Sequence, residues 1–121
     1  MYILAVFLSL IIVFQVKHWY IDFVLQTDEM VKGKGIYGNP QGLLHSFQHG
    51  IVTFGLMLFY VPELALMLAC IDFVTHYHID YIKMKYGCRD ITQKEFWIHL
   101  GLDQMMHQIV YVLLLVLIIL G

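Results

Sequence analysis

Four apolar stretches of this chain each carry two potential metal ligands that are four residues apart. In chain order the pairs are His18 and Asp22, His45 and His49, His76 and Asp80, and Asp103 and His107. Residues i and i+4 lie one above the other on a helix, so each stretch presents a stacked pair on one face if it is helical. Ionisable groups within a membrane are costly and mark functional sites. The repeated spacing therefore predicts helices that share one polar site.

The composition places these stretches in a membrane protein. Hydrophobic residues make up 60% of the 121-residue chain and charged residues only 13%, and the mean hydropathy is +0.75. A soluble chain of this length could not bury so much apolar surface. The length allows one domain, residues 1–121. The formal net charge of −2 disfavours nucleic acid as a partner.

The pattern of apolar runs and turn residues predicts four membrane-spanning helices. They cover about residues 2–26, 41–61, 64–86 and 93–120. A glycine-rich loop (27–40), a short turn at Pro62-Glu63 and a loop at 87–92 join them. Asn39-Pro40 is typical of a helix start, and Thr92-x-x-Glu95 of a capping box. Because short connections make successive helices antiparallel, the predicted fold is an all-α, up-down four-helix transmembrane bundle.

The positions of the basic residues predict the orientation of this bundle. The seven Lys and Arg residues are Lys17, Lys32, Lys34, Lys83, Lys85, Arg89 and Lys94. All of them belong to the first and third connections or to the helix ends beside these. By the positive-inside rule, loops 27–40 and 87–92 are cytoplasmic and both termini lie outside. The predicted location is the bacterial cytoplasmic (inner) membrane.

A count along each helix at about 1.5 Å per residue places the eight ligands at two depths. One layer, roughly 20 Å from the outer end, contains His18, His49, His76 and His107. The second, at roughly 26 Å, contains Asp22, His45, Asp80 and Asp103. The first helix fits both levels if the N-terminus projects by one turn. We therefore expect one buried His/Asp cluster in the cytoplasmic half of the membrane, with an apolar plug on its outer side.

Imidazole nitrogens and carboxylate oxygens are good ligands for divalent metal ions. All eight residues are candidate ligands for one or two ions; the donor set favours Zn²⁺, with Fe²⁺ and Mn²⁺ as alternatives. Asp22, Asp80 and Asp72 are the candidate catalytic carboxylates. Asp72 lies one turn from His76 and would hold its second ring N–H or transfer a proton. Gln26 and Gln104 lie close enough to ligands in the sequence to orient them.

A competing interpretation needs no metal. Polar pairs of this kind also hold membrane helices together by hydrogen bonds. A single pair fits either interpretation equally well. Four pairs at matched depth favour metal binding, because burying that many ionisable groups without an ion is costly.

At these residues the chain resembles a family of small bacterial and phage membrane proteins known only as a domain of unknown function. The resemblance covers most of the chain and is carried by His18-Trp-Tyr-Ile-Asp22, Leu44-His45-Ser46 with His49, His76-Tyr-His-Ile-Asp80 and Asp103-Gln-Met-Met-His107. It implies no established reaction. More distantly, the chain looks like the membrane-bound metal-dependent hydrolases, which implies metal-assisted hydrolysis. The His45/His49 spacing also resembles one histidine box of the membrane di-iron desaturases, but the further histidine clusters of that family are absent.

These observations predict an integral-membrane metal-binding protein, and first a metal-dependent hydrolase. The basic residues at the cytoplasmic entrance favour a phosphate-bearing or lipid substrate. One alternative is a metal-ion or proton transporter, which needs polar access from both sides. Another is a non-enzymatic membrane effector in which a structural metal staples a small bundle. The expected partners are membrane lipid and a small-molecule or lipid substrate, and the sequence is compatible with a homo-oligomer.

Overall fold

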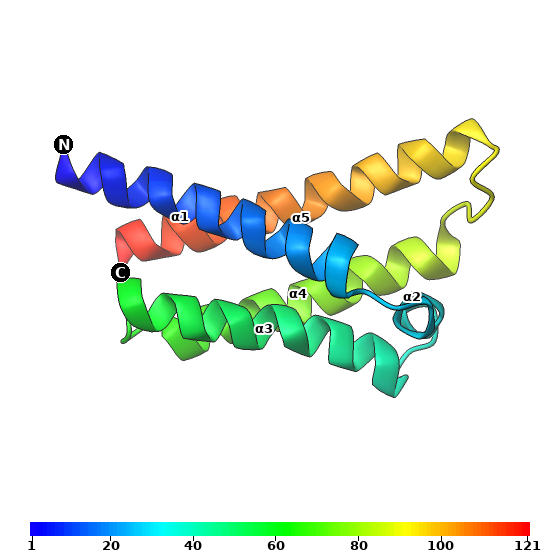
Figure 1. The fold of residues 1–121 in the computed structure, drawn as a ribbon, viewed down its shortest axis with the longest axis horizontal. Coiled ribbons are helices and arrows are strands. Elements are labelled where there is room, and N and C mark those ends of the chain that lie inside the picture. The colour runs from blue at the N-terminus through cyan, green and yellow to red at the C-terminus, as the bar shows by residue number, and fades with distance from the viewer.

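The computed structural model describes residues 1–121 and consists of helices and short connections (Figure 1). The four long helices are α1 (Tyr2–Trp19), α3 (Pro40–Tyr60), α4 (Ala65–Tyr86) and α5 (Lys94–Leu120). A π-helical segment, η1 (Tyr20–Leu25), extends α1, and a short helix, α2 (Asp28–Lys34), follows it. The all-α class predicted from the sequence is confirmed.

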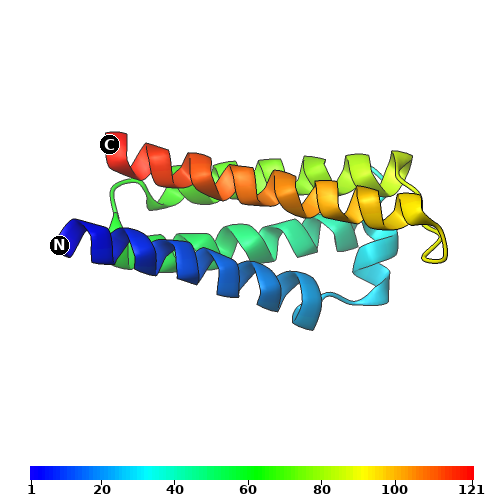
Figure 2. The ribbon, with the colours of Figure 1, turned by 90° about the horizontal axis from the view of Figure 1, so that it is seen from above.

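Successive long helices run in opposite directions. α1 and α4 lead away from the end of the molecule at which both termini lie, and α3 and α5 return to it (Figures 1 and 2). α3 packs against α4, α4 against α5, and α1 against both α5 and α3. The four helices therefore form a closed ring in the up-down order that short connections predict.

The residues at the helix starts explain part of this arrangement. Asn39 caps α3, because its side chain accepts a hydrogen bond of 2.9 Å from the backbone N–H of Gln41. The predicted capping box at Thr92 is wrong. The backbone N–H and the hydroxyl of Thr92 both donate to Asp90 Oδ1, at 3.0 and 2.7 Å, and α5 begins only at Lys94. Thr92 therefore stabilises the preceding turn.

The expected loop at 27–40 contains helix α2, so that expectation is also wrong. Thr27 Oγ1 accepts a hydrogen bond of 3.3 Å from the backbone N–H of Met30 and so caps the helix. Acidic residues lie in the first turn and lysines in the last, which suits the helix dipole. Gly42 permits α3 to approach α2, because a Cβ built on Gly42 would lie 3.0 Å from the carbonyl oxygen of Gly33.

Three segments are long and apolar enough to cross a membrane. They are Tyr2–Leu25, which joins α1 and η1, together with α3 and α5. The expected fourth span, 64–86, corresponds to α4, which is not among them. α4 contains 22 residues, a sufficient length for a hydrocarbon core of about 30 Å, but it carries Asp72, Asp80, Lys83 and Lys85. Both aspartates are buried inside the ring of helices.

A cluster of nine buried apolar residues fills the ring on the side of the termini. It consists of Leu10, Phe14, Met57, Ala65, Leu68, Val110, Tyr111, Leu114 and Leu115. The potential metal ligands lie farther from the termini along the same helices. This arrangement agrees with an apolar plug between the polar groups and the end at which the termini lie.

Candidate metal centre

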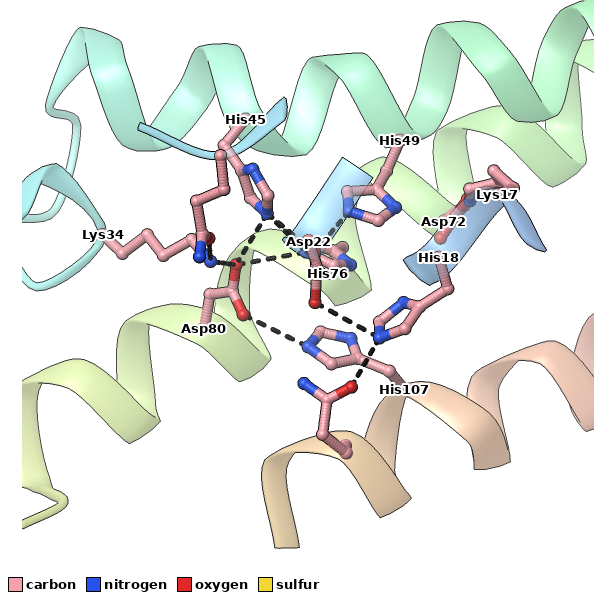
Figure 3. Close-up of polar contacts among 12 residues, drawn as sticks. Lys17, His18, Asp22, Lys34, His45, His49, Asp72, His76, Asp80 and His107 are labelled. Carbon is pink, nitrogen blue, oxygen red and sulfur yellow. Dashed lines mark hydrogen bonds and ion pairs between the residues drawn. The ribbon is translucent and has the colours of Figure 1, made fainter. Parts of the chain in front are cut away.

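The eight predicted ligands come together inside the ring of helices. α1 and η1 supply His18 and Asp22, α3 supplies His45 and His49, α4 supplies His76 and Asp80, and α5 supplies Asp103 and His107. Each of the eight exposes 6% of its surface or less. The side chains of His18, Asp22, His45, His49, His76, Asp80 and His107 point toward one another (Figure 3). The convergence expected from the shared spacing and depth is thus present in the structure.

Asp22 lies at the centre of the first group of ligands. Its Oδ1 atom lies 2.8 Å from His49 Nε2, 3.0 Å from His45 Nε2 and 3.5 Å from His76 Nε2. Its Oδ2 atom lies 3.2 Å from His18 Nε2. Because one carboxylate oxygen cannot accept three full hydrogen bonds in good geometry, this crowding of nitrogens is more than hydrogen bonding alone requires.

Asp80 forms the second centre. Its Oδ1 atom lies 3.1 Å from His107 Nε2, and its Oδ2 atom lies 3.1 Å from His76 Nε2 and 3.5 Å from His45 Nε2. Asp103 Oδ1 lies 3.5 Å from His107 Nε2. The two centres share His45 and His76, so the polar residues form one continuous cluster.

The imidazole rings are stacked in the order that the predicted upper layer requires. The rings of His49 and His76 are stacked with centroids 3.6 Å apart, and those of His76 and His107 with centroids 4.0 Å apart. His18 completes the layer, at 5.1 Å from the His107 ring.

The donor atoms have the spacing that a metal ion needs. His45 Nε2 and His76 Nε2 lie 3.2 Å apart, and ligands of a tetrahedral ion with bonds of about 2.0–2.1 Å are separated by about 3.4 Å. The other ring nitrogens, Nδ1 of His45, His49 and His76, are buried and have no hydrogen-bond partner. Each of these rings therefore faces the cluster with Nε2, and no hydrogen bond at Nδ1 fixes its orientation.

Three sets of donor atoms are compact enough to hold an ion. They are the set of His18, Asp22, His49 and His76, the set of His45, His76 and Asp80, and the set of Asp80, Asp103 and His107. In each set the donor atoms lie within 4.8 Å of one another. Since His76 and Asp80 each occur in two sets, the three sets cannot all be filled independently.

Gln104 forms hydrogen bonds with two of the predicted ligands, whereas Gln26 contacts Lys34 and through it Asp80. Gln104 Oε1 lies 2.7 Å from His18 Nε2, and Gln104 Nε2 donates to Asp103 Oδ2 at 3.1 Å. The other ring nitrogen of His18 lies 2.9 Å from the hydroxyl of Tyr111. Gln26 Oε1 accepts a hydrogen bond from Lys34. His18 is therefore held at both nitrogens.

Three lysines contact the carboxylates of this region, and all three were expected in the first or third connection or at the helix ends beside them. Lys34 Nζ lies 2.8 Å from Asp80 Oδ2, and Lys83 Nζ lies 3.5 Å from Asp103 Oδ2. Lys17 forms an ion pair with Asp72. Lys17 and Lys34 are each only 5% exposed. Lys34, which was expected among the basic residues of the cytoplasmic entrance, and Lys17 are therefore interior residues, each paired with a buried carboxylate.

The predicted partnership between Asp72 and His76 is also wrong. Asp72 binds Lys17 and accepts a hydrogen bond of 2.5 Å from the hydroxyl of Thr53, and Nδ1 of His76 has no partner. A lysine inside an expected span was the available signal. Lys17 needs a buried partner, and Asp72 was an intramembrane carboxylate that lies outside the four ligand pairs.

A pocket of about 390 Å³ reaches the cluster from the side, between α4 and α5. Its polar lining comprises Lys83, His99 and Asp103. Its apolar walls include Ile79, Ile82, Leu102 and Met106. Asp103 belongs both to this pocket and to the metal-ligand cluster, so the pocket leads to the candidate site.

Comparison with known proteins gives a family without a function. Residues 10–120 match the family described as "Protein of unknown function (DUF3307)". No curated protein matches the chain, and no solved structure matches it.

Proposed function

The chain belongs to this family of unknown function, DUF3307, and from its site we propose that it is an integral-membrane, metal-dependent hydrolase. The proposed substrate is a lipid or another phosphate-bearing compound that enters from the cytoplasmic side. One observation carries the proposal: all four long helices aim imidazoles and carboxylates at one buried point. A chain this small would not bury eight such groups merely to hold its helices together.

The proposed membrane arrangement has four spans. Three segments have the length and apolarity of spans, and α4 has the length while its aspartates face inward. With α2 and the α4–α5 connection on the cytoplasmic side, both termini are outside. Exposed apolar side chains such as Ile12, Val52, Val74 and Leu113 would then face lipid.

The first set of donors best fits a catalytic ion. Asp22, His49 and His76 supply three ligands, and catalytic zinc sites have three protein ligands with a further position for water. His18 faces that position, because its nitrogens are already held by Gln104 and Tyr111. Zn²⁺ is the proposed ion, with Fe²⁺ and Mn²⁺ as the alternatives. The ion acidifies a bound water, so that hydroxide is available at neutral pH.

Other residues of the cluster have proton-handling roles in this proposal. His18 keeps a proton on Nε2, because the two atoms that this nitrogen faces, Gln104 Oε1 and Asp22 Oδ2, are both acceptors. His18 therefore positions Asp22, and Asp80 is the group that accepts the proton of the attacking water. Asp80 lies between His76 and His107 and passes the proton toward the leaving group. Asp72 is assigned to structure, because Lys17 and Thr53 hold it away from the ligands.

The lateral pocket supports a substrate that combines an anionic group with an apolar one. Its walls are mainly apolar, and Lys83 lies where an anionic group would approach Asp103 and the cluster. An opening between two helices suits a substrate that enters from the inner leaflet. These features favour a phospholipid-like compound over a wholly soluble one.

The proposal is tested by metal content and activity measured on the same samples. Purified wild-type protein should contain a divalent metal and release a headgroup or phosphate from anionic phospholipid vesicles. His49→Ala should lose both properties, because it removes a central ligand. His78→Ala is the matched control, because His78 is an exposed histidine on α4 outside the cluster and its loss should change neither property. Activity that survives complete metal removal would contradict the proposal.

Two features of the structure favour a hydrolase over the alternatives. A transporter needs a polar route between the cluster and the termini, and the nine-residue apolar cluster occupies that region. A structural ion is fully ligated by protein, whereas the hydrogen bonds of His18 leave three ligands in the first set. Metal flux into liposomes at a rate above that of the His49→Ala variant would instead support transport.

A further inference from the structure

The carboxylates of the cluster differ in whether a lysine neutralises them. Lys34 contacts Asp80 at 2.8 Å and Lys83 contacts Asp103 at 3.5 Å. Outside the cluster, Lys17 does the same for Asp72. Asp22 is different: its ion-pair partners are histidines, and no lysine pairs with it. One uncompensated carboxylate therefore remains among the ligands.

The charges of these carboxylates and lysines determine how many ions the His/Asp cluster can hold. Three ligand carboxylates and two ammonium groups leave one negative charge, and a divalent ion with one bound hydroxide carries one positive charge. A single ion thus makes the buried site neutral. A second ion would leave the pocket with a large positive charge, which is strongly unfavourable in surroundings of low dielectric constant.

The position of Lys34 also indicates that the cluster binds a single ion. Its ammonium group lies at Asp80 Oδ2, the oxygen that His45 and His76 also face. Gln26 Oε1 accepts a second hydrogen bond from it, and the side chain is buried. Lys34 is also the last residue of α2, where the helix dipole favours a cation. The ammonium group therefore occupies the place that an ion bound to Asp80 Oδ2, His45 and His76 would need.

We infer that the His/Asp cluster binds a single divalent ion at Asp22, His49 and His76. Lys34 and Lys83 substitute for a second ion at Asp80 and Asp103. This inference rests on the proposed metal site and deepens it, since it fixes the number of ions. The site is mononuclear, although it has enough ligands for two ions. Removal of the two lysine charges should convert the set of Asp80, Asp103 and His107 into a second ion site.

The test counts zinc ions per chain after equilibration with Zn²⁺ and removal of excess. Wild type should retain a single ion, and the double variant Lys34→Gln/Lys83→Gln should retain two. The matched control is Lys32→Gln/Lys85→Gln, which removes the same charge from exposed positions of the same two helices. The control should retain a single ion.

A charge-balanced variant controls for misfolding of the lysine variants. Lys34→Gln/Asp80→Asn removes a lysine together with its carboxylate, and this variant should still retain a single ion, whereas Asp22→Asn should retain none. Two ions in wild type, or one ion in the Lys34→Gln/Lys83→Gln variant, would overturn the inference and leave the metal site standing. No ion in wild type would overturn the inference and the proposed function together.

Discussion

At the scale of single residues, the pairing of buried charges decides whether this interior is stable. Lys17 is surrounded by the carboxylate of Asp72, the hydroxyl of Thr53 at 2.9 Å and the ring of Tyr111, whose centroid lies 4.9 Å from Nζ. An ammonium group in the interior of a helical bundle is tolerated only with partners of this kind. The pair joins α1, α3 and α4 next to the cluster.

Substitution of Asp72 by Asn should destabilise the protein strongly. The change leaves the Lys17 ammonium group buried without an anion, which costs about 3–5 kcal/mol. The free energy of unfolding in detergent, measured by titration with SDS, reports the loss. The double variant Lys17→Met/Asp72→Leu should recover most of it, because it removes both charges and keeps the volume.

Glu63→Gln is the control for this prediction, since Glu63 is an exposed carboxylate in the turn between α3 and α4. It should change the unfolding free energy by less than about 0.5 kcal/mol. A similarly small effect of Asp72→Asn would show that the Lys17–Asp72 pair does not contribute to stability.

The sequence predicts the ligands of the site but not their ammonium partners. The i, i+4 spacing is a property of each helix alone, so His45 and His49 can be recognised before the helices are packed. The contact between Lys34 and Asp80 joins residues 46 positions apart through a helix that sequence patterns did not reveal. Such pairings depend on packing, and a lysine near a helix end is otherwise typical of a membrane interface.

At the scale of elements, helix α2 lies at the end of the molecule opposite the termini and packs against α3 and α4 (Figure 1). It is only seven residues long, so hydrophobic periodicity cannot identify it. Its place depends on two glycines, since a Cβ on Gly42 would lie 3.1 Å from the backbone carbon of Gly33 and 3.2 Å from Cα of Lys34. This close approach brings Lys34 to Asp80.

Gly42→Ala should therefore destabilise the protein by about 1–3 kcal/mol, because the new methyl group meets backbone that cannot yield easily. Unfolding in SDS measures the effect. Gly55→Ala on the same helix is the matched control, as nothing lies within 4 Å of the added Cβ. It should be neutral or stabilise the helix by up to about 1 kcal/mol. Equal effects of the two variants would contradict this account of α2 packing.

The π-helical segment η1 is a second element that the sequence did not reveal. Residues 2–26 were expected to form one regular helix, but the turn that carries Asp22 is wider. π-helical turns recur at functional sites and re-aim the side chains that they carry. Asp22 is the carboxylate on which the most imidazoles converge, so the widened turn coincides with the centre of the proposed ion site.

At the scale of the whole molecule, the order of helices follows from short connections, which were visible in the sequence. The connection at Pro62 and Glu63 is so short that α3 and α4 must be antiparallel. It forms a tight turn in which the backbone N–H of Leu64 donates to the carbonyl of Val61 at 2.9 Å. The membrane topology remains a prediction from the basic residues. Lys17 and Lys34 are buried, so the excess of positive charge at the predicted cytoplasmic side depends on the other five basic residues.

Cysteine labelling in intact cells tests this topology. A membrane-impermeant maleimide should label a cysteine introduced by Glu63→Cys, in a background in which Cys70 and Cys88 are replaced by Ser. It should not label the native Cys88 in the Cys70→Ser protein until the cells are permeabilised, since Cys88 lies in the connection between α4 and α5. Labelling of Cys88 alone would reverse the proposed orientation.

X-ray absorption at the metal edge of the zinc-loaded protein tests the central claim most directly. The account predicts a nitrogen and oxygen shell at about 2.0–2.1 Å with the outer-shell scattering of imidazole, and no sulfur at about 2.3 Å. The nitrogen and oxygen shell and the imidazole scattering should both disappear in Asp22→Asn protein prepared in the same way. A sulfur shell from Cys70 or Cys88, or zinc surrounded by water alone, would contradict an ion held by the histidines and aspartates of four helices.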